Sequence, residues 1–314
     1  RNRLGLARWL TDPTHPLMAR VTVNRFWQQM FGQGLVETSD NFGLQGSPPT
    51  HPELLDWLAR DFVAHGWDVK RTLRQIALSA TYRQSSHASS ALLARDPQNL
   101  LLARGPARRL TAEMLRDQAL AAGGLLVDKI GGPSVKPYQP PGLWEEIAMG
   151  KPKYVVGEGE DLYRRSLYTF WKRTVPPPSM MLFDAAERNV CTVRRQSTST
   201  PLQALALLND VQVVEAARLI GQRMLKEGGA SPDAWIAWGF RLVTGRRPDA
   251  RERDILRALY DEQLALFQAD TAAANQFNAF GATPTDATLP SAMRAAAGMV
   301  AKALLNFDET VMRR

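Results

Sequence analysis

Residues 164–200 hold the side chains best suited to bind an anion. The basic residues there include Arg164, Arg165, Lys172, Arg173, Arg194 and Arg195, and the hydroxyl run Ser197-Thr198-Ser199-Thr200 follows them. This run precedes a predicted helix start. Free backbone N–H groups at a helix N-terminus, together with arginine guanidinium groups, suit a phosphate, sulfate or carboxylate. The alternative is that the arginines form internal ion pairs with Asp161, Asp184 or Glu187.

A second group of candidate binding residues is aromatic. Tyr138, Trp144 and Tyr154 lie in one irregular segment, and Glu145-Glu146 follows Trp144 directly. Exposed aromatic rings could hold the faces of sugars, while neighbouring carboxylates accept hydrogen bonds from hydroxyl groups. The alternative is that these rings anchor their segment onto a helical body.

Paired carboxylates are the third candidate. Glycoside hydrolysis needs two carboxyl groups about 5–10 Å apart across a cleft, and the candidates are Glu53, Asp56, Glu113, Asp117 and Asp184. Glu53 suits a helix cap, and Glu113 and Asp117 lie on the same face of one predicted helix, around Arg116. The sequence therefore favours structural ion pairs for these residues.

The sequence holds no metal-ligand or nucleophile signature. Its histidines, His15, His51, His65 and His87, never fall at the i, i+4 spacing of a helical zinc site, and Gly-x-Ser-x-Gly is absent. His15 and His51 precede prolines at predicted helix starts, so a capping role is expected. Cys191 is the single cysteine, which excludes an intramolecular disulfide, and we expect it to be a small buried residue.

Helix start and stop signals recur around these candidates. Thr50-His51-Pro52-Glu53 predicts a capping box, with a hydroxyl at the N-cap and Glu at N3. Asp68 and Thr111 are predicted N-caps. Gly32 and Gly123-Gly124 are predicted stops. A succession of short helices is therefore expected over the first 124 residues.

The longest apolar pattern begins at Thr200. Thr200-Pro201-Leu202-Gln203 predicts another capping box, with Pro at the first helical position. The run from Leu202 to Gly229 is apolar nearly all round at first, so we predict that its front half is buried. Further helices are predicted after Pro232, Pro248 and Pro290.

Residues 131–160 interrupt the helices, because they are dense in Gly and Pro and have little periodicity. The aromatic stretch Ser166 to Phe170 has β-propensity and predicts a short strand or hairpin. We therefore predict three regions, residues 1–124, 125–178 and 179–314, either as separate parts or as one single domain.

Composition is that of a globular protein. The 314 residues are 45% hydrophobic and 22% charged, the net charge is +8 and the pI is near 9.9. The charge makes anionic partners candidates, but the basic residues are spread along the chain and no nucleic-acid reading motif is present, so nucleic acid is not favoured. No apolar run approaches the ~20 residues of a membrane span. The chain opens with Arg1 inside a helical pattern, from which we expect a piece of a longer protein.

Seven segments, in order along nearly the whole chain, resemble planctomycete-specific domain one (Domain of Unknown Function 1553). They read ARVTVNRFWQQMFGQGLVET, NFGLQGSPPTHPELLDWLARDFVAHGWDVKR, SATYRQSS, ARRLTAEMLRDQAL, GGPSV, YRRSLYTFWKRTVPPPSMMLFDA and STPLQALALLND. Members often have a His pair at Gln29-Met30 and Pro-Asp at Ala186-Glu187, so this chain departs from the family at both places. The first departure speaks against a metal site there.

The resemblance implies a mainly helical module near the C-terminal end of large exported proteins with cytochrome c-like domains. It implies no catalytic residues. A periplasmic or cell-envelope location follows from it, as does haem c in a neighbouring domain, since this chain has no attachment motif.

We therefore predict a mainly α fold, an irregular bundle of about nine helices with a Gly/Pro-rich central excursion and a little β-structure. The predicted function is a binding or assembly module that contacts a partner domain or an anionic glycan. The predicted binding residues are Arg164, Arg165, Arg194, Arg195, Ser197, Thr198, Tyr138 and Trp144. The alternative is a polysaccharide-active enzyme with paired carboxylates.

Overall fold

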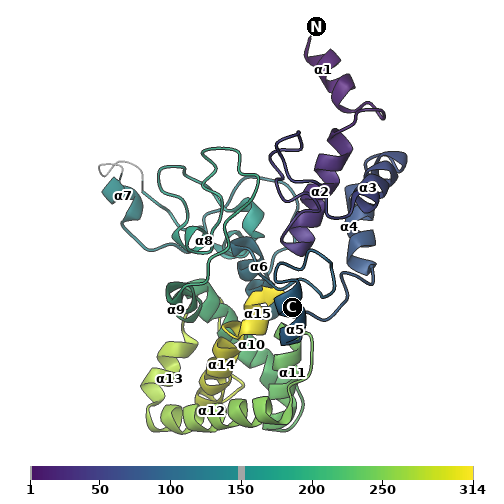
Figure 1. Cartoon of the computed structure of the whole chain (residues 1–314). Coiled ribbons are helices and arrows are strands. Elements are labelled where there is room, and N and C mark those ends of the chain that lie inside the picture. The colour runs from purple at the N-terminus through teal and green to yellow at the C-terminus, as the bar shows by residue number, and fades with distance from the viewer. Residues whose placement is uncertain (1, 148–152, 314) are drawn as a thin grey trace. The chain divides into compact units, whose positions relative to one another are not determined.

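The computed structural model describes residues 2–147 and 153–313 and is mainly helical (Figure 1). The predicted fold class is thus confirmed. Within the described residues there are fifteen α-helices and one two-stranded antiparallel sheet. The helices outnumber the nine expected because several are single turns, such as α7 (Leu143–Ile147), α8 (Pro178–Leu182) and α15 (Asp308–Val311). None of the described helices is long and apolar enough to cross a membrane.

The chain divides into two compact units. Unit 1 comprises Arg1–Arg109 with Met312–Arg314, and unit 2 comprises Leu110–Val311. The division precedes α6 (Ala112–Gly123). The reason is that α6 packs against α10 (Val211–Glu227), far along the chain, and so belongs with unit 2.

Unit 1 is built on three helices, α2 (Met18–Phe31), α3 (Pro52–Ala64) and α4 (Val69–Leu78). Their buried faces form one core that includes Val23, Leu58, Phe62 and Ile76. The unit also contains α1 (Arg3–Leu10), α5 (Ser90–Arg95) and the sheet of β1 (Arg108–Arg109) with β2 (Met312–Arg313). Helix α1 buries none of its residues.

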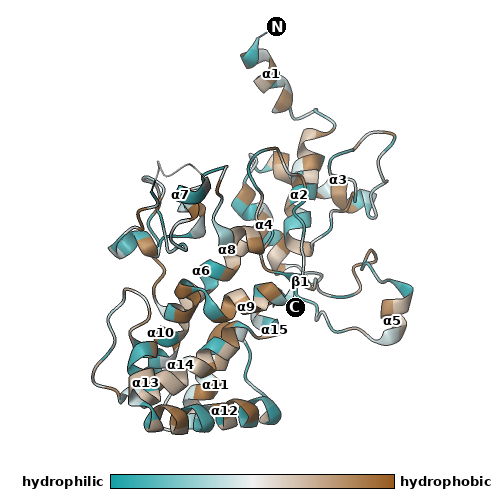
Figure 2. Ribbon diagram, turned by 90° about the vertical axis from the view of Figure 1, so that its left-hand side faces the viewer, coloured by the Kyte–Doolittle hydropathy of each residue, from teal (hydrophilic) through white to brown (hydrophobic). Residues whose placement is uncertain are grey.

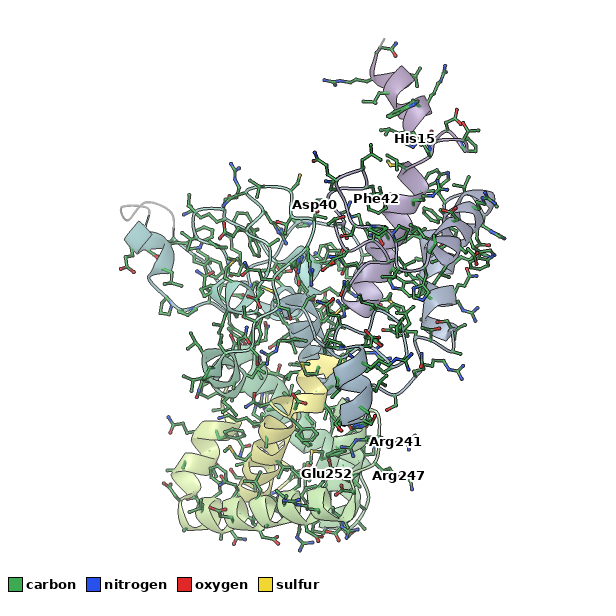
Figure 3. The ribbon with its side chains drawn as sticks, viewed as in Figure 1. His15, Asp40, Phe42, Arg241, Arg247 and Glu252 are labelled. Carbon is green, nitrogen blue, oxygen red and sulfur yellow. The ribbon has the colours of Figure 1, made fainter. Side chains whose placement is uncertain are left out.

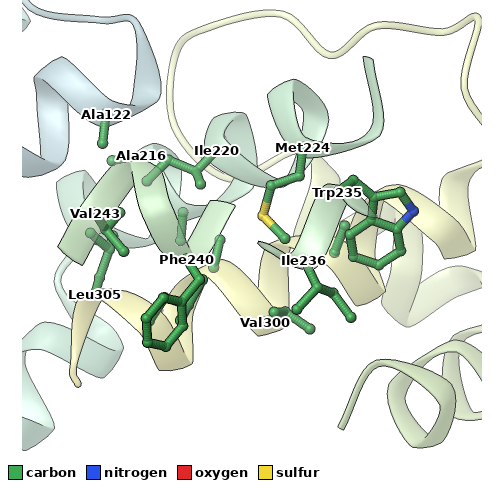
Figure 4. Close-up of a cluster of buried hydrophobic side chains, with 14 of the residues drawn as sticks. Ala122, Ala216, Ile220, Met224, Trp235, Ile236, Phe240, Val243, Val300 and Leu305 are labelled. Atoms are coloured by element: carbon green, nitrogen blue, oxygen red, sulfur yellow. The ribbon is translucent and has the colours of Figure 1, made fainter. Parts of the chain in front are cut away.

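Unit 2 is organised around α10. This helix packs against α6 and α14 (Ser291–Leu305), with α11 (Pro232–Thr244) and α12 (Ala250–Ala269) beside them. Figure 4 shows the core side chains that these helices bring together, among them Ile220, Met224, Ile236 and Phe240. Helix α13 (Thr271–Asn278) adds to the same unit. Figure 2 shows polar and apolar residues alternating along α12, as expected for a helix with one buried face.

The run predicted as one helix after Thr200 is two helices. Helix α9 (Pro201–Asn209) ends at Asp210, whose extended backbone breaks the pattern and whose carboxylate caps α10 by accepting from Gln212 N at 2.9 Å. The predicted burial of the front half is wrong. In α9, Leu202 and Leu205 are each more than half exposed, whereas α10 is buried along most of its length.

Most of the predicted helix caps are confirmed, and one is wrong. The Thr200 capping box, the Asp68 and Thr111 caps and the left-handed stops at Gly32 and Gly124 are confirmed. The box at Thr50 is wrong, because α3 begins one residue later and has no side-chain cap. His15 has the expected role, since its Nδ1 accepts from Met18 N at 3.0 Å where α1 gives way to α2 (Figure 3).

The central excursion, residues 125–178, contains α7, a 3-10 turn at Gly159–Leu162 and another at Ser166–Tyr168. The second turn replaces the strand predicted there. Ser166 is drawn into a turn because its N–H and Oγ both bond Asp117 Oδ1, at 2.8 and 2.6 Å. The excursion keeps only isolated bridges, such as Val135 with Thr169.

Candidate functional site

The segment between α8 and α9 is the most accessible part of the predicted site. We call residues 187–200 the strap. Every residue of the strap is exposed, and no backbone–backbone hydrogen bond among the described residues uses a strap N–H group. Its conformation must therefore depend on side chains that anchor it.

The first anchor is Trp171. Its indole N–H donates to Glu187 O at 3.0 Å, and the guanidinium of Arg188 lies 4.4 Å from the ring centroid. Arg188 itself has a left-handed backbone conformation, with φ of 63°. The contact holds the start of the strap against unit 2 and uses the Arg188 charge in a cation–π interaction.

The middle anchor joins the strap to α6. Arg195 Nη1 donates to both carboxylate oxygens of Glu113, at 3.0 and 2.8 Å. Burial acts to raise the pKa of the Glu113 carboxyl, but the hydrogen bonds, led by those from Arg195, outweigh it and hold the pKa below its ordinary 4.5. Glu113 is therefore charged at neutral pH and keeps Arg195 in place.

The last anchor precedes α9. Thr198 N donates to Asp184 Oδ2 at 2.7 Å, and Gln203 Nε2 donates to Thr198 Oγ1 at 3.1 Å. Gln203 also donates to Leu182 O at 2.8 Å, which joins the end of α8 to the start of α9. These bonds occupy the hydroxyl of Thr198 that was a predicted anion ligand.

Between these anchors the strap presents both charge and apolar surface. Arg194 is exposed and has no hydrogen bond or ion pair with the described residues. Val190 is 77% exposed, and Ser197 is exposed as well. Cys191 is also exposed, so its predicted burial is wrong. An apolar residue type such as cysteine predicts burial, but the strap is exposed at this position.

Arg164 and Arg165 have a different role from the arginines of the strap. Arg164 is 3% exposed, and its guanidinium donates to the carbonyls of Lys129 and Pro133 at 2.9 Å and stacks 3.8 Å from the Tyr168 ring centroid. Arg165 pairs with Asp128 at 2.8 Å. Both side chains thus hold the Gly/Pro-rich excursion onto unit 2.

Arg116, which the sequence did not single out as a site residue, joins three parts of unit 2. Its guanidinium donates to Leu162 O at 2.9 Å, to Arg164 O at 2.8 Å and to Gln212 Oε1 at 2.5 Å. Burial lowers its pKa to about 10. Arg116 thereby fixes the α6 face next to Glu113, on which the strap depends. In the sequence, Arg116 lies next to Asp117, and this neighbour indicates only a local ion pair.

The predicted aromatic residues turn inward. Trp144 is 6% exposed and packs edge-on against Tyr154, with ring centroids 5.2 Å apart. Tyr154 Oη donates to Pro137 O at 2.6 Å, and burial raises its pKa to about 12. Tyr138 is half-buried, and its hydroxyl accepts from Ala282 N at 2.8 Å. None of these rings offers an open face of the kind that a sugar stacks on.

The candidate carboxylates mostly have separate structural partners. Asp56 pairs with Arg20 at 2.7 Å, Glu113 with Arg195, Asp117 with Ser166 and Asp184 with Thr198. A small pocket of about 40 Å³ lies among α6, α8, α9 and the start of α10, and Asp210 is its one carboxylate. Burial raises the pKa of Asp210, whose role is to cap α10. This pocket therefore holds no carboxylate pair.

Within residues 2–147 and 153–313, no group of three or more His, Cys, Asp or Glu side chains could hold a metal ion. His51 contacts Thr50 Oγ1 at 3.0 Å, and His65 pairs with Asp61 at 3.2 Å.

The fold and the strap define a class of protein: a helical module with an exposed basic segment held on a buried frame. The chain belongs to the PSD1 family, described as a protein of unknown function (DUF1553), whose model matches residues 2–260. No curated protein and no solved structure matches the chain.

Proposed function

We propose that this chain is a binding module that docks an acidic segment of a partner domain onto the strap. The observation that carries the proposal is the Arg194 guanidinium, exposed and without a partner among the described residues, in a segment anchored on both sides of it. The strap contains three arginines and one acidic residue, so its charge complements an acidic partner.

The anchors favour binding because they lower its entropic cost. A free loop would lose conformational entropy when it binds, whereas the strap is already held at Trp171, Glu113 and Asp184. Its backbone also offers N–H groups that make no backbone–backbone hydrogen bond among the described residues, and an acidic peptide can use them. Val190 and Val193, 77% and 41% exposed, supply apolar contact beside the charge.

The geometry favours a protein partner over a glycan at the strap. Sugar binding commonly uses open aromatic faces, but Trp144 is 6% exposed and Tyr138 is half-buried. Trp171, the aromatic residue nearest to the strap, already has Arg188 on its ring. An acidic peptide needs only the arginine, the valines and the backbone.

The proposed setting follows from the family resemblance. We propose that the partner domain belongs to the same exported, cytochrome-linked protein, with haem c in a neighbouring domain and a periplasmic or cell-envelope location. The module contributes no haem ligand in this proposal, only the docking surface.

The test is the binding of a fluorescein-labelled peptide of alternating Glu and Val, followed by fluorescence anisotropy at two salt concentrations. We expect saturable binding that weakens with salt, because exposed charges more than about 8–10 Å apart are screened at physiological ionic strength. Arg194→Glu should weaken binding about tenfold or more, since it replaces an attraction by a repulsion.

The matched control is Arg251→Glu. Arg251 is exposed on α12, and its substitution changes the net charge by the same amount as Arg194→Glu. We expect it to alter the affinity by less than about twofold. Equal losses in the two variants would mean that the peptide responds only to net charge, and the strap would then not be the docking surface.

A further inference from the structure

Two lysine ammonium groups of the central excursion lie over one buried indole ring. Lys172 Nζ is 4.4 Å from the centroid of the Trp144 ring, and Lys136 Nζ is 5.4 Å from it. Lys136 Nζ also lies 5.4 Å from the Phe170 centroid and 6.0 Å from that of Tyr154. Two positive charges thus converge on one aromatic cluster.

No carboxylate of the described residues neutralises them. Among the described residues the lysine ion pairs are those of Lys129 with Glu160 and of Lys226 with Asp286. The aromatic rings attract the ammonium groups through their negative faces. A ring carries no net charge, however, so the cluster keeps an excess of positive charge.

The cluster also has buried donors without acceptors. Lys172 Nζ and Trp144 Nε1 are both buried and have no hydrogen-bond partner among the described residues, and Trp144 as a whole is 6% exposed. An ammonium carries three N–H donors and an indole carries one. Buried donors that lack acceptors are unfavourable. An oxyanion would supply acceptor oxygens and negative charge together.

Backbone bonds hold this arrangement in place. Val135 N donates to Tyr168 O, and Phe170 N donates to Val135 O, both at 2.8 Å. Gly157 N donates to Lys136 O at 2.8 Å. The backbone at Lys136 and at Phe170, two residues before Lys172, is thus paired to neighbouring segments, which helps to preorganise the two ammonium groups.

We propose that Lys136, Lys172 and Trp144 form a binding site for an oxyanion: a carboxylate, sulfate or phosphate group. Such a group accepts hydrogen bonds at several oxygens and carries the charge that the two lysines need. The site is independent of the strap, since the two share no residue. A free anion and the acidic group of a saccharide present the same chemistry to it.

The test uses the indole N–H of Trp144 as a reporter, in protein labelled with nitrogen-15. The Trp144 signal is identified by its loss in Trp144→Phe. Sodium sulfate, phosphate and acetate are titrated against sodium chloride at constant ionic strength. We expect a saturable shift of this signal with at least one of them, and binding that is about tenfold weaker or more in Lys172→Met and in Lys136→Met.

The control is Lys129→Met, in the same excursion, because Lys129 is exposed and paired with Glu160. Its affinity should stay within about twofold of that of the unchanged protein. Lys172→Arg keeps the charge and should keep the saturable shift, so it tests the site even if Lys172→Met fails to fold. A sulfated disaccharide that binds more tightly than inorganic sulfate would identify a glycan source, and equal affinity would identify a free ion.

Two results would overturn the proposal. One is the absence of a saturable Trp144 shift with all three anions, in which case the rings alone hold the lysines. The other is an unchanged shift in both Lys172→Met and Lys136→Met.

Discussion

Helices α10 and α14 approach each other closely at Gly221, which makes Gly221→Ala a sharp test of the unit 2 core. A Cβ added there would lie 2.5 Å from Gly298 N, 2.7 Å from the Ala297 carbonyl carbon and 2.8 Å from Gly298 Cα. All three atoms are backbone atoms of α14. The added methyl group cannot be relieved by a rotamer change, so one helix must move.

Overpacking of a filled core costs about 1–3 kcal/mol. Ala is favoured over Gly in a helix by about 1 kcal/mol, so a loss in the upper part of that range leaves about 1–2 kcal/mol of net destabilisation. For a unit of this size each kcal/mol lowers Tm by about 2–4 °C. We therefore expect Gly221→Ala to lower Tm by about 2–8 °C in thermal unfolding followed by circular dichroism.

Gly5→Ala is the matched control, because it makes the same change inside a helix without the close approach. A Cβ at Gly5 would meet only Asn2 Oδ1, at 3.5 Å, an ordinary contact. Its Tm should be unchanged or slightly higher, owing to helix propensity. If Gly221→Ala were as stable as the parent, the close packing of α10 on α14 would be refuted.

Two further predictions concern the strap. Arg195→Met should cost about 0.5–1 kcal/mol at pH 7, because the ion pair with Glu113 is partly exposed. Since the folded-state pKa of Glu113 is lowered, this contribution is present above pH 4.5 and is lost as the pH falls through the folded-state pKa. The Tm values of parent and variant should therefore converge as the pH is lowered below 4.5 through the folded-state pKa, and a constant gap would contradict the ion pair. Trypsin should cleave the folded chain after Arg188, Arg194 or Arg195 before any site in α10, because the strap is exposed throughout; mass spectrometry of the first fragments decides this.

Local signals in the sequence predicted the features that depend on neighbouring residues. The Thr200 capping box is formed by atoms three residues apart, Gln203 N to Thr200 Oγ1 and Thr200 N to Gln203 Oε1. The stops at Gly32 and Gly124 need only a left-handed residue. Such features require no knowledge of the rest of the fold, so they could be predicted well.

Features that depend on distant partners could not be predicted. The leucines of α9 look like core residues by composition, yet the helix breaks at Asp210 and α10 takes the central place. The role of Arg116 depends on Leu162, Arg164 and Gln212, which are remote in sequence. Exposure of Cys191 likewise depends on the absence of packing over the strap.

The same distinction separates the arginines of the predicted site. Arg164 and Arg194 are alike in the sequence, because each lies next to a second arginine. Arg164 lies where loop carbonyls converge, so its hydrogen bonds are used within the fold. Arg194 lies between two anchors that hold its backbone but leave its guanidinium unpaired among the described residues. Since a buried arginine cannot reach a partner and an exposed one can, we propose that docking at the strap depends on Arg194.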